Sequence, residues 1–119
     1  MRGRMFLIHW NLGEVQGLAK GFRAQGWKVD FEYEDGARAG KQIRARPPDV
    51  VVIYLTRLPS HGRETAHGLR ALKATREIPI VFVDGLAEKV AATRAKVPDA
   101  IYITTAGLRK TLARFARPR

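Results

Sequence analysis

The fold is decided by the stretch PDVVVIYL, residues 48–55. After its proline and aspartate, Val50–Leu55 is apolar throughout. Such a run is far too short to span a bilayer, and it lacks the polar alternation of a strand with one wet face. It therefore predicts a central strand of a parallel sheet, covered by helices on both faces.

Working outward from this run, short apolar segments alternate with stretches of helical periodicity. The other strands are expected at Met5–His9, Trp27–Tyr33, Ile80–Val83 and Ala100–Ile103. Two helices are expected from segment bounds: one from Asp35 to about Arg46, and one over about Arg63–Thr75 that buries Thr65, Leu69 and Leu72. The other three are expected from apolar residues at helical spacing, in chain order Val15, Leu18, Ala19 and Phe22; then Leu86, Val90, Thr93 and Val97; then Leu108, Leu112 and Phe115. Asn11 and Gly26 suit the two ends of the first helix.

The alternation of five strands with five helices predicts a single α/β domain over residues 1–119. In the segment Trp27–Tyr33, apolar residues alternate with Lys28, Asp30 and Glu32, which indicates an edge strand with one wet face. With this strand at an edge and Val50–Leu55 central, the order 2-1-3-4-5 fits best. The fold class is a flavodoxin-like (βα)5 doubly wound sandwich.

Composition narrows the function classes. The chain has no cysteine, which excludes a disulfide scaffold, thiolate zinc sites and a cysteine nucleophile. It has neither a signal-peptide pattern nor a membrane-length apolar run, so a cytoplasmic protein is expected. Its 22 Lys and Arg against 11 Asp and Glu give a net charge of +11. Such an excess suggests a polyanionic partner, although a solvated basic surface would have the same composition.

Several short motifs lie at characteristic distances from one another along the chain. Asp35-Gly36 and Pro48-Asp49 stand fourteen residues apart, and the segment LPSHGRE, residues 58–64, follows the central strand. Leu69-Arg70 and Ile78-Pro79 come next. Together these motifs resemble the receiver domain of bacterial response regulators over essentially the whole chain.

The resemblance implies a particular chemistry, which is phosphoryl transfer from a histidine kinase to an aspartate. The family needs two acidic residues after the first strand, an acceptor aspartate after the third, a Ser or Thr after the fourth and a lysine after the fifth. Here these positions are occupied by His9, Trp10, Tyr54, Asp84 and Thr104, or Thr105 for the last. All five are replaced.

The replacements predict a receiver-like domain that does not use phosphorylation. Imidazole and indole supply no carboxylate for Mg²⁺, and a tyrosine cannot form an acyl phosphate. The family's switch aromatic aligns with Ile101, while Tyr102 lies one residue further and faces the other side of the strand. We expect no enzymatic activity and no cofactor.

The strand ends could instead hold a small ligand, since ligands of open α/β sheets bind there. Asn11, Thr56 and His61 would join the five replaced positions around this crevice, with Trp10 and Tyr54 as aromatic walls. The alternative is that bulky side chains fill it. His9, His61 and Asp84 lack the spacing of a metal site, so no bound metal is expected.

Cations gather toward the C-terminus. Lys110, Arg114 and Arg117 recur at i, i+4 and i+7, and the segment before them carries Lys89, Arg94, Lys96 and Arg109 against few acids. In the resembled family this part of the chain binds partners and forms homodimers. A symmetric dimer of so basic a face would repel itself, so the favoured partner is an acidic protein. Nucleic acid bound along the basic stripe is the alternative, and a small-ligand sensor is the third.

Overall fold

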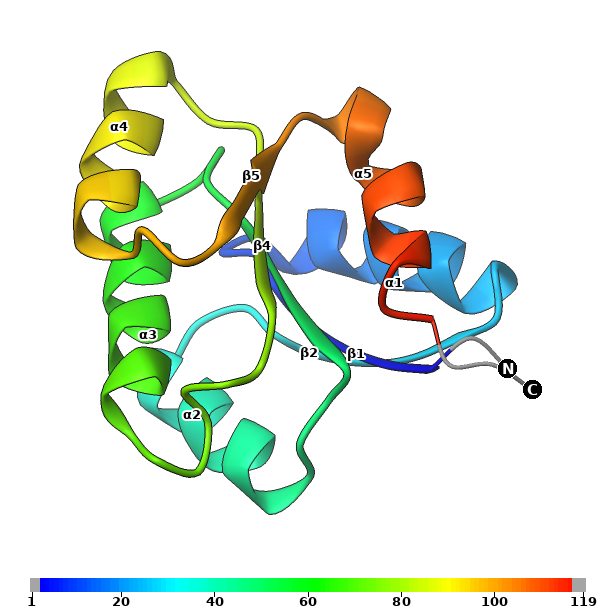
Figure 1. The fold of residues 1–119 in the computed structure, drawn as a ribbon. Helices are drawn as coiled ribbons and strands as arrows, with labels where there is room; N and C mark the ends of the chain where they lie inside the picture. The colour runs from blue at the N-terminus through cyan, green and yellow to red at the C-terminus, as the bar shows by residue number, and fades with distance from the viewer. Residues whose placement is uncertain (1–2, 117–119) are drawn as a thin grey trace.

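Residues 3–116 are described by the computed structural model, and they contain one five-stranded sheet (Figure 1). The strands are β1 (Gly3–Ile8), β2 (Trp27–Glu32), β3 (Val50–Tyr54), β4 (Ile80–Val83) and β5 (Ile101–Ile103). Every neighbouring pair is parallel, and the order is β2-β1-β3-β4-β5. The predicted topology is confirmed, with β2 and β5 at the edges.

Five helices cover the sheet within the same residues. They are α1 (Leu12–Ala24), α2 (Gly36–Ala45), α3 (Pro59–Ala71), α4 (Ala87–Lys96) and α5 (Thr105–Ala113). Helices α1 and α5 lie on one face of the sheet and α2, α3 and α4 on the other (Figure 1). Among the described residues, no helix is long and apolar enough to cross a membrane.

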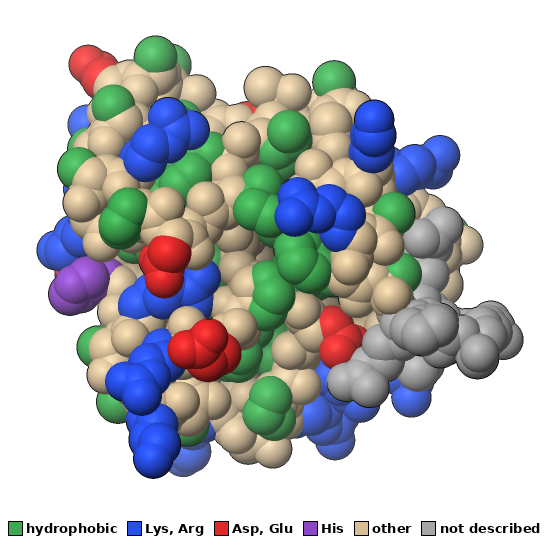
Figure 2. All heavy atoms as spheres, in the orientation of Figure 1, with side chains coloured by type: hydrophobic (Ala, Val, Ile, Leu, Met, Phe, Trp, Pro, Cys, Tyr) green, Lys and Arg blue, Asp and Glu red, His purple; other side chains and the backbone are tan. Residues whose placement is uncertain are grey.

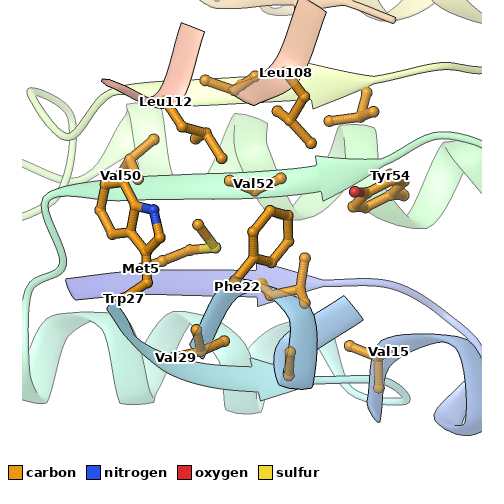
Figure 3. Packing of buried hydrophobic residues seen from close by; sticks show 14 residues of the cluster. Met5, Val15, Phe22, Trp27, Val29, Val50, Val52, Tyr54, Leu108 and Leu112 are labelled. Carbon is orange, nitrogen blue, oxygen red and sulfur yellow. The ribbon is translucent and has the colours of Figure 1, made fainter. Parts of the chain in front are cut away.

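Alternation along the strands divides the core into two halves. Met5 and Leu7 of β1 pack on the α1/α5 side with Val52 and Phe22, while Phe6 and Ile8 pack on the other side. Figure 3 shows the α1/α5 half, in which Phe22 points at Val52 and Tyr54 stands at the end of β3. Since every residue of Val50–Leu55 is buried, the prediction of a central strand is confirmed.

Two side-chain caps fix where the first two helices begin. Asn11 Oδ1 accepts from the backbone N–H of Glu14 at 2.9 Å, and Asp35 Oδ1 accepts from that of Arg38 at 3.1 Å. Each cap satisfies a donor that the first helical turn leaves without a partner. Gly26 leaves the first helix at φ 101°, in the left-handed region that favours glycine.

The predicted bounds of the third helix, about Arg63–Thr75, were wrong. It begins at Pro59 rather than near Arg63, because proline is well suited to a first helical position, and it ends at Ala71. Leu72, predicted to be buried, is extended and 43% exposed. Thr75 lies beyond the helix, where its buried hydroxyl donates to the carbonyl of Leu69 at 2.6 Å.

Smaller differences occur elsewhere. Gly62, Ala66 and Leu69 form the buried stripe of α3, so Thr65 is only partly buried. Leu86 precedes α4 and is 67% exposed. In the last helix Leu108 and Leu112 are buried as predicted, whereas Phe115 lies past Ala113 and is partly buried against the same core.

The predicted wet face of β2 holds for Lys28 and Asp30 but not for Glu32, which is 3% exposed. Its carboxylate accepts from the Arg38 guanidinium at 2.7 Å through both Nε and Nη2. It also accepts from the backbone N–H groups of Glu34 and Asp35, each at 3.0 Å. A carboxylate can be buried at this strand end because these donors replace water.

Candidate functional site

Four of the predicted site residues meet at the strand ends. His9 follows β1, Tyr54 ends β3, Thr56 comes two residues later, and Asp84 follows β4. Together with Glu14 and neighbouring residues of α1 they line a hollow of about 430 Å³. The hollow lies on the α1/α5 side of the sheet, so this part of the predicted crevice exists.

His9 is buried, with 3% of its surface exposed. Its Nε2 donates to Glu14 Oε2 at 2.9 Å, and its ring centroid lies 5.1 Å from that of Tyr54. Its Nδ1 has no hydrogen-bond partner within residues 3–116. Burial lowers the pKa of His9, although Glu14 acts in the opposite direction, so the ring is neutral near pH 7.

The acidic neighbour of His9 stays ionised and is paired with an arginine. Glu14 Oε1 accepts from Arg57 Nη2 at 2.9 Å, and this bond lowers the pKa of the Glu14 carboxyl. Arg57 reaches it from the loop after β3, 43 residues along the chain. His9, Glu14 and Arg57 therefore form one chain of polar contacts, in which His9 and Glu14 line the hollow.

Tyr54 stands at the position that the resemblance assigns to the phosphate acceptor. Only 5% of it is exposed, and its ring belongs to the α1/α5 core (Figure 3). Burial raises the pKa of its phenol to about 12, and the nearby charge of Asp84 adds to this. The group at this position is thus a neutral hydroxyl, partly walled by apolar atoms.

Asp84 has a strained backbone, with φ at 59° in a region that few L-residues adopt. Its Oδ1 accepts from the backbone N–H of Thr105 at 2.9 Å, and its Oδ2 accepts from the Thr105 hydroxyl. Thr104, by contrast, is exposed at the start of α5. Of the two candidates for the lysine position, Thr105 is therefore the one in contact with Asp84.

The remaining crevice residues are not where the sequence interpretation put them. Trp10 packs with the α2/α3 core, on the opposite face of the sheet from Tyr54, so the two do not form walls of one crevice. His61 contacts Trp10 in a tilted arrangement, with ring centroids 5.7 Å apart. Trp10 lies on the opposite face because it directly follows His9, and consecutive residues at a strand end point to opposite faces. Asn11 is used in capping α1.

The strand-end hollow does not suit Mg²⁺. This ion takes hard oxygen ligands in octahedral geometry. The carboxylates here are Glu14, which is bound to His9 and Arg57, and Asp84, which is bound to Thr105. The other side-chain donors are an imidazole, a phenol and the hydroxyl of Thr56. Over residues 3–116 no group of three His, Cys, Asp or Glu side chains could hold a metal ion.

A second candidate site is the face formed by α4, β5 and α5, where apolar side chains lie between Lys and Arg and acids are few (Figure 2). We call it the basic face, and its described cations are Lys89, Arg94, Lys96, Arg109, Lys110 and Arg114, all exposed. Arg117 of the predicted stripe lies outside the described residues. The three residues of β5 are half-buried, so their side chains are partly available on this face.

Some of these cations are already engaged. The Arg94 guanidinium lies 4.7 Å from the ring centroid of Tyr102, whose hydroxyl donates to the carbonyl of Val97 at 2.6 Å. Lys96 donates to Glu64 at 2.7 Å. As predicted, Tyr102 faces the α2/α3/α4 side, where it stacks on Phe82, and Ile101 faces the other.

The sequence interpretation missed the partners that fix the hollow. Glu14 stood out only as a residue of the first helical turn, and Arg57 did not stand out at all. No local pattern links positions 14 and 57. An acid in the first turn after a strand-end histidine is the one signal that could have suggested the pair.

No family model matches the sequence, and no curated protein matches it. Solved structures do match. The chemotaxis protein CheY4 of Vibrio cholerae has a TM-score of 0.78 at 16% identity, over 97% of this chain and 99% of that one. A putative response regulator of Chloroflexus aurantiacus has 0.79 at 15%, over 97% and 98%.

A third similar structure is the receiver domain of the sensor histidine kinase PA1611 from Pseudomonas aeruginosa. It has a TM-score of 0.74 at 20% identity, over 97% of this chain and 98% of that one, and it was solved with magnesium in its active-site cleft. The chain therefore has the fold of response-regulator receiver domains.

Proposed function

We propose that this chain is a non-enzymatic signalling domain on the receiver fold that binds a partner protein and does not use aspartate phosphorylation. The observation that carries the proposal is Tyr54, a buried neutral phenol at the acceptor position. The proposal extends the resemblance of the sequence to receivers, since a fold alone does not define a function. We place its action in the cytoplasm.

The charges around Tyr54 support independence from phosphorylation. A phosphoryl group would meet the carboxylate of Asp84, which repels it, and the two positions directly after β5 hold Thr104 and Thr105 rather than a lysine that could neutralise it. Arg57, which pairs with a residue lining the hollow, is already bound to Glu14. Phosphorylation would therefore add negative charge beside Asp84, with the exposed Arg109 of α5 as the cation that shares a hollow with Tyr54.

The basic face supports an acidic partner protein. Its half-buried β5 offers apolar surface, and the surrounding Lys and Arg offer charge, which together suit a partner with apolar contacts and an acidic rim (Figure 2). A symmetric dimer would bring the same cations together. An acidic partner is therefore favoured over self-association through this face.

The first test is inertness. With acetyl phosphate and Mg²⁺, we expect intact-protein mass spectrometry to show no increase of about 80 Da, the mass of one phosphoryl group. The reason is that no carboxylate at the hollow is free to accept that group. A receiver domain that retains its acceptor aspartate is the positive control. Phosphorylation of any residue lining the hollow would refute the proposal.

The second test concerns the partner. The triple variant Lys89→Glu, Arg109→Glu, Lys110→Glu should lose a partner that the native chain retains in a pull-down from its host. All three side chains are exposed, so the fold should persist. The triple variant Lys28→Glu, Lys41→Glu, Lys73→Glu is the matched control, since these exposed residues lie on β2, on α2 and after α3, away from the basic face. A partner retained by the first variant and lost by the control would place the interface elsewhere.

Nucleic-acid binding along the last helix is the alternative function. Lys110 and Arg114 are exposed on this segment, which carries no acid. If they and Arg117 each contact a phosphate, affinity for an oligonucleotide should fall with salt at a log–log slope of about −2 to −3. Tight, sequence-selective binding at physiological salt, abolished by reversing these charges, would favour this alternative over a protein partner.

A further inference from the structure

A larger hollow than the one at the strand ends lies between α2 and α3, with a volume of about 510 Å³. We call it the α2–α3 groove. Both helices begin at the carboxyl edge of the sheet and run toward its opposite edge, so the groove has one end at each edge. It lies on the face of the sheet away from α1 and α5, and none of its lining residues belongs to the basic face.

Glycines form the walls of the groove. On α2, Gly36 and Gly40 contribute no side chain, and on α3 neither does Gly68. A Cβ on Gly36 would lie 2.5 Å from the Thr65 hydroxyl, so this glycine permits the helices to approach. A Cβ on Gly68 would meet nothing within 4 Å. The absence of a side chain at Gly68 therefore leaves room that the packing of the helices does not require.

The end of the groove at the carboxyl edge is aromatic. The Trp10 ring lies against the starts of both helices, because Cβ atoms built on Gly36 and Gly62 would come within 3.9 and 3.7 Å of it. His61 of α3 contacts Trp10, with the two rings tilted by 58°. These two rings form an aromatic corner at one end, and the half-exposed Leu72 adds apolar surface at the other.

The opposite end is basic. Arg44, in the last turn of α2, lines the groove, and its guanidinium reaches back to Gly40, where a Cβ would lie 3.5 Å from Nη1. The carboxylate of Glu64 is bound to Lys96 at 2.7 Å. Residues 41–49 and 70–79, which include the ends of the two helices, carry six Lys and Arg against two acids. The unneutralised charge of the groove is therefore positive and lies at this end.

We propose that the α2–α3 groove binds a small anionic amphiphile, a free molecule with an apolar ring or chain and one negatively charged group. The apolar part lies along the glycine walls toward Trp10, and the charged group lies at Arg44. The volume is in the usual range of small-molecule sites, about 300–1,000 Å³. This site goes beyond the proposed function, because it uses neither the strand-end hollow nor the basic face.

Two probes test the proposal, 8-anilinonaphthalene-1-sulfonate and dodecanoate, each titrated calorimetrically and by the fluorescence of Trp10. We expect saturable binding of one molecule per chain. Gly68→Leu and Gly40→Leu, one on each wall, should each weaken it at least about tenfold by filling the groove. Arg44→Gln should weaken both anions and leave binding of neutral dodecanol unchanged.

Gly21→Leu is the matched control, since Gly21 is also a helical glycine with open space around its Cβ but lies on α1. It should bind both probes as the native chain does. Equal affinity in Gly68→Leu and Gly40→Leu, or no saturable binding by the native chain, would overturn the proposal. Binding to phosphatidylglycerol vesicles without binding of free dodecanoate would overturn it too, by assigning the basic end to a membrane surface.

Discussion

Two ionisable residues are buried at the neighbouring ends of β1 and β2, with their side chains on opposite faces of the sheet, and they are accommodated in opposite ways. His9 and Glu32 are each 3% exposed, and the backbone N–H of His9 donates to the carbonyl of Glu32 at 3.3 Å. Glu32 is charged and surrounded by donors, and Arg38 is the largest cause that lowers its pKa to about 2. His9 is neutral and has one partner, Glu14.

The difference shows how each turn offsets the free-energy cost of burying an ionisable side chain. The β2–α2 turn keeps a charge and supplies it with an arginine and backbone N–H groups, so the carboxylate stabilises the turn. The β1–α1 turn instead removes the charge by depressing the pKa of the imidazole. Only the second arrangement leaves a polar atom without a partner, His9 Nδ1. The β1–α1 turn is therefore the less satisfied of the two.

The largest effect is expected from removing the better-satisfied group. Glu32→Ala should lower the free energy of unfolding by about 3 kcal/mol, because it leaves Arg38 and the turn amides without an acceptor. Urea denaturation measures this. Asp30→Ala on the same strand is the control, since its pair with Arg4 is exposed and 3.8 Å long, and it should cost about 0–1 kcal/mol. Equal losses would mean that the burial of Glu32 contributes nothing.

The next prediction places a carboxylate where no such donors exist. Tyr54→Asp should destabilise the chain by about 1–3 kcal/mol and should not restore phosphorylation, because the new charge would face Asp84 and apolar walls. Tyr54→Phe, which keeps the ring, is the control and should cost less. A neutral or stabilising Tyr54→Asp would show that the hollow is open and wet.

A smaller effect should appear in the pH dependence. Because the pKa of His9 is lowered on folding, the unfolded chain binds its proton more readily. Stability from His9 is therefore present above its ordinary pKa of about 6.5 and is lost as pH falls below it. Glu32 adds a separate loss between about pH 4.5 and 2. If the urea midpoint is measured as a function of pH, His9→Gln should remove the fall that begins below about pH 6.5. His67→Gln, at an exposed site, should leave that fall unchanged.

The smallest effect concerns the single partner of His9. Glu14 raises the pKa of the imidazole against the larger effect of burial, so Glu14→Gln should lower that pKa further. An NMR titration of the His9 ring signals measures the change, with Glu88→Gln as the control. An upward shift would show that Arg57, not Glu14, governs this histidine.

The fold could be predicted because its signals are local. The apolar run at 50–55 and the alternation around it define a strand in the middle of a parallel sheet, and helical periodicity supplies the layers. Asn11 and Asp35 cap the helices at the expected places because a cap depends on residues three positions apart. These features need no knowledge of distant contacts.

The candidate site was harder to predict, because it depends on side-chain direction and on long-range pairs. The strand pattern of side chains ended with β1, so it could not show that the side chains of His9 and Trp10 lie on opposite faces of the sheet. The alternation of β2 predicted a wet side chain at Glu32, which was wrong, because the arginine that allows its burial comes from the next helix. The positions replaced at the strand ends were readable one by one, whereas their mutual arrangement was not.

Burial is uneven across the sheet, and this has a consequence for how the molecule opens. Every residue of β3 is buried, whereas β5 has three residues, all half-buried, and an outer edge that no other described strand covers. Backbone amides exchange with solvent through local openings, which are easiest where few apolar contacts must be broken. Hydrogen exchange should therefore begin at β5 and its flanking helices and reach β3 last, so the basic face is expected to be the side of the molecule that fluctuates first.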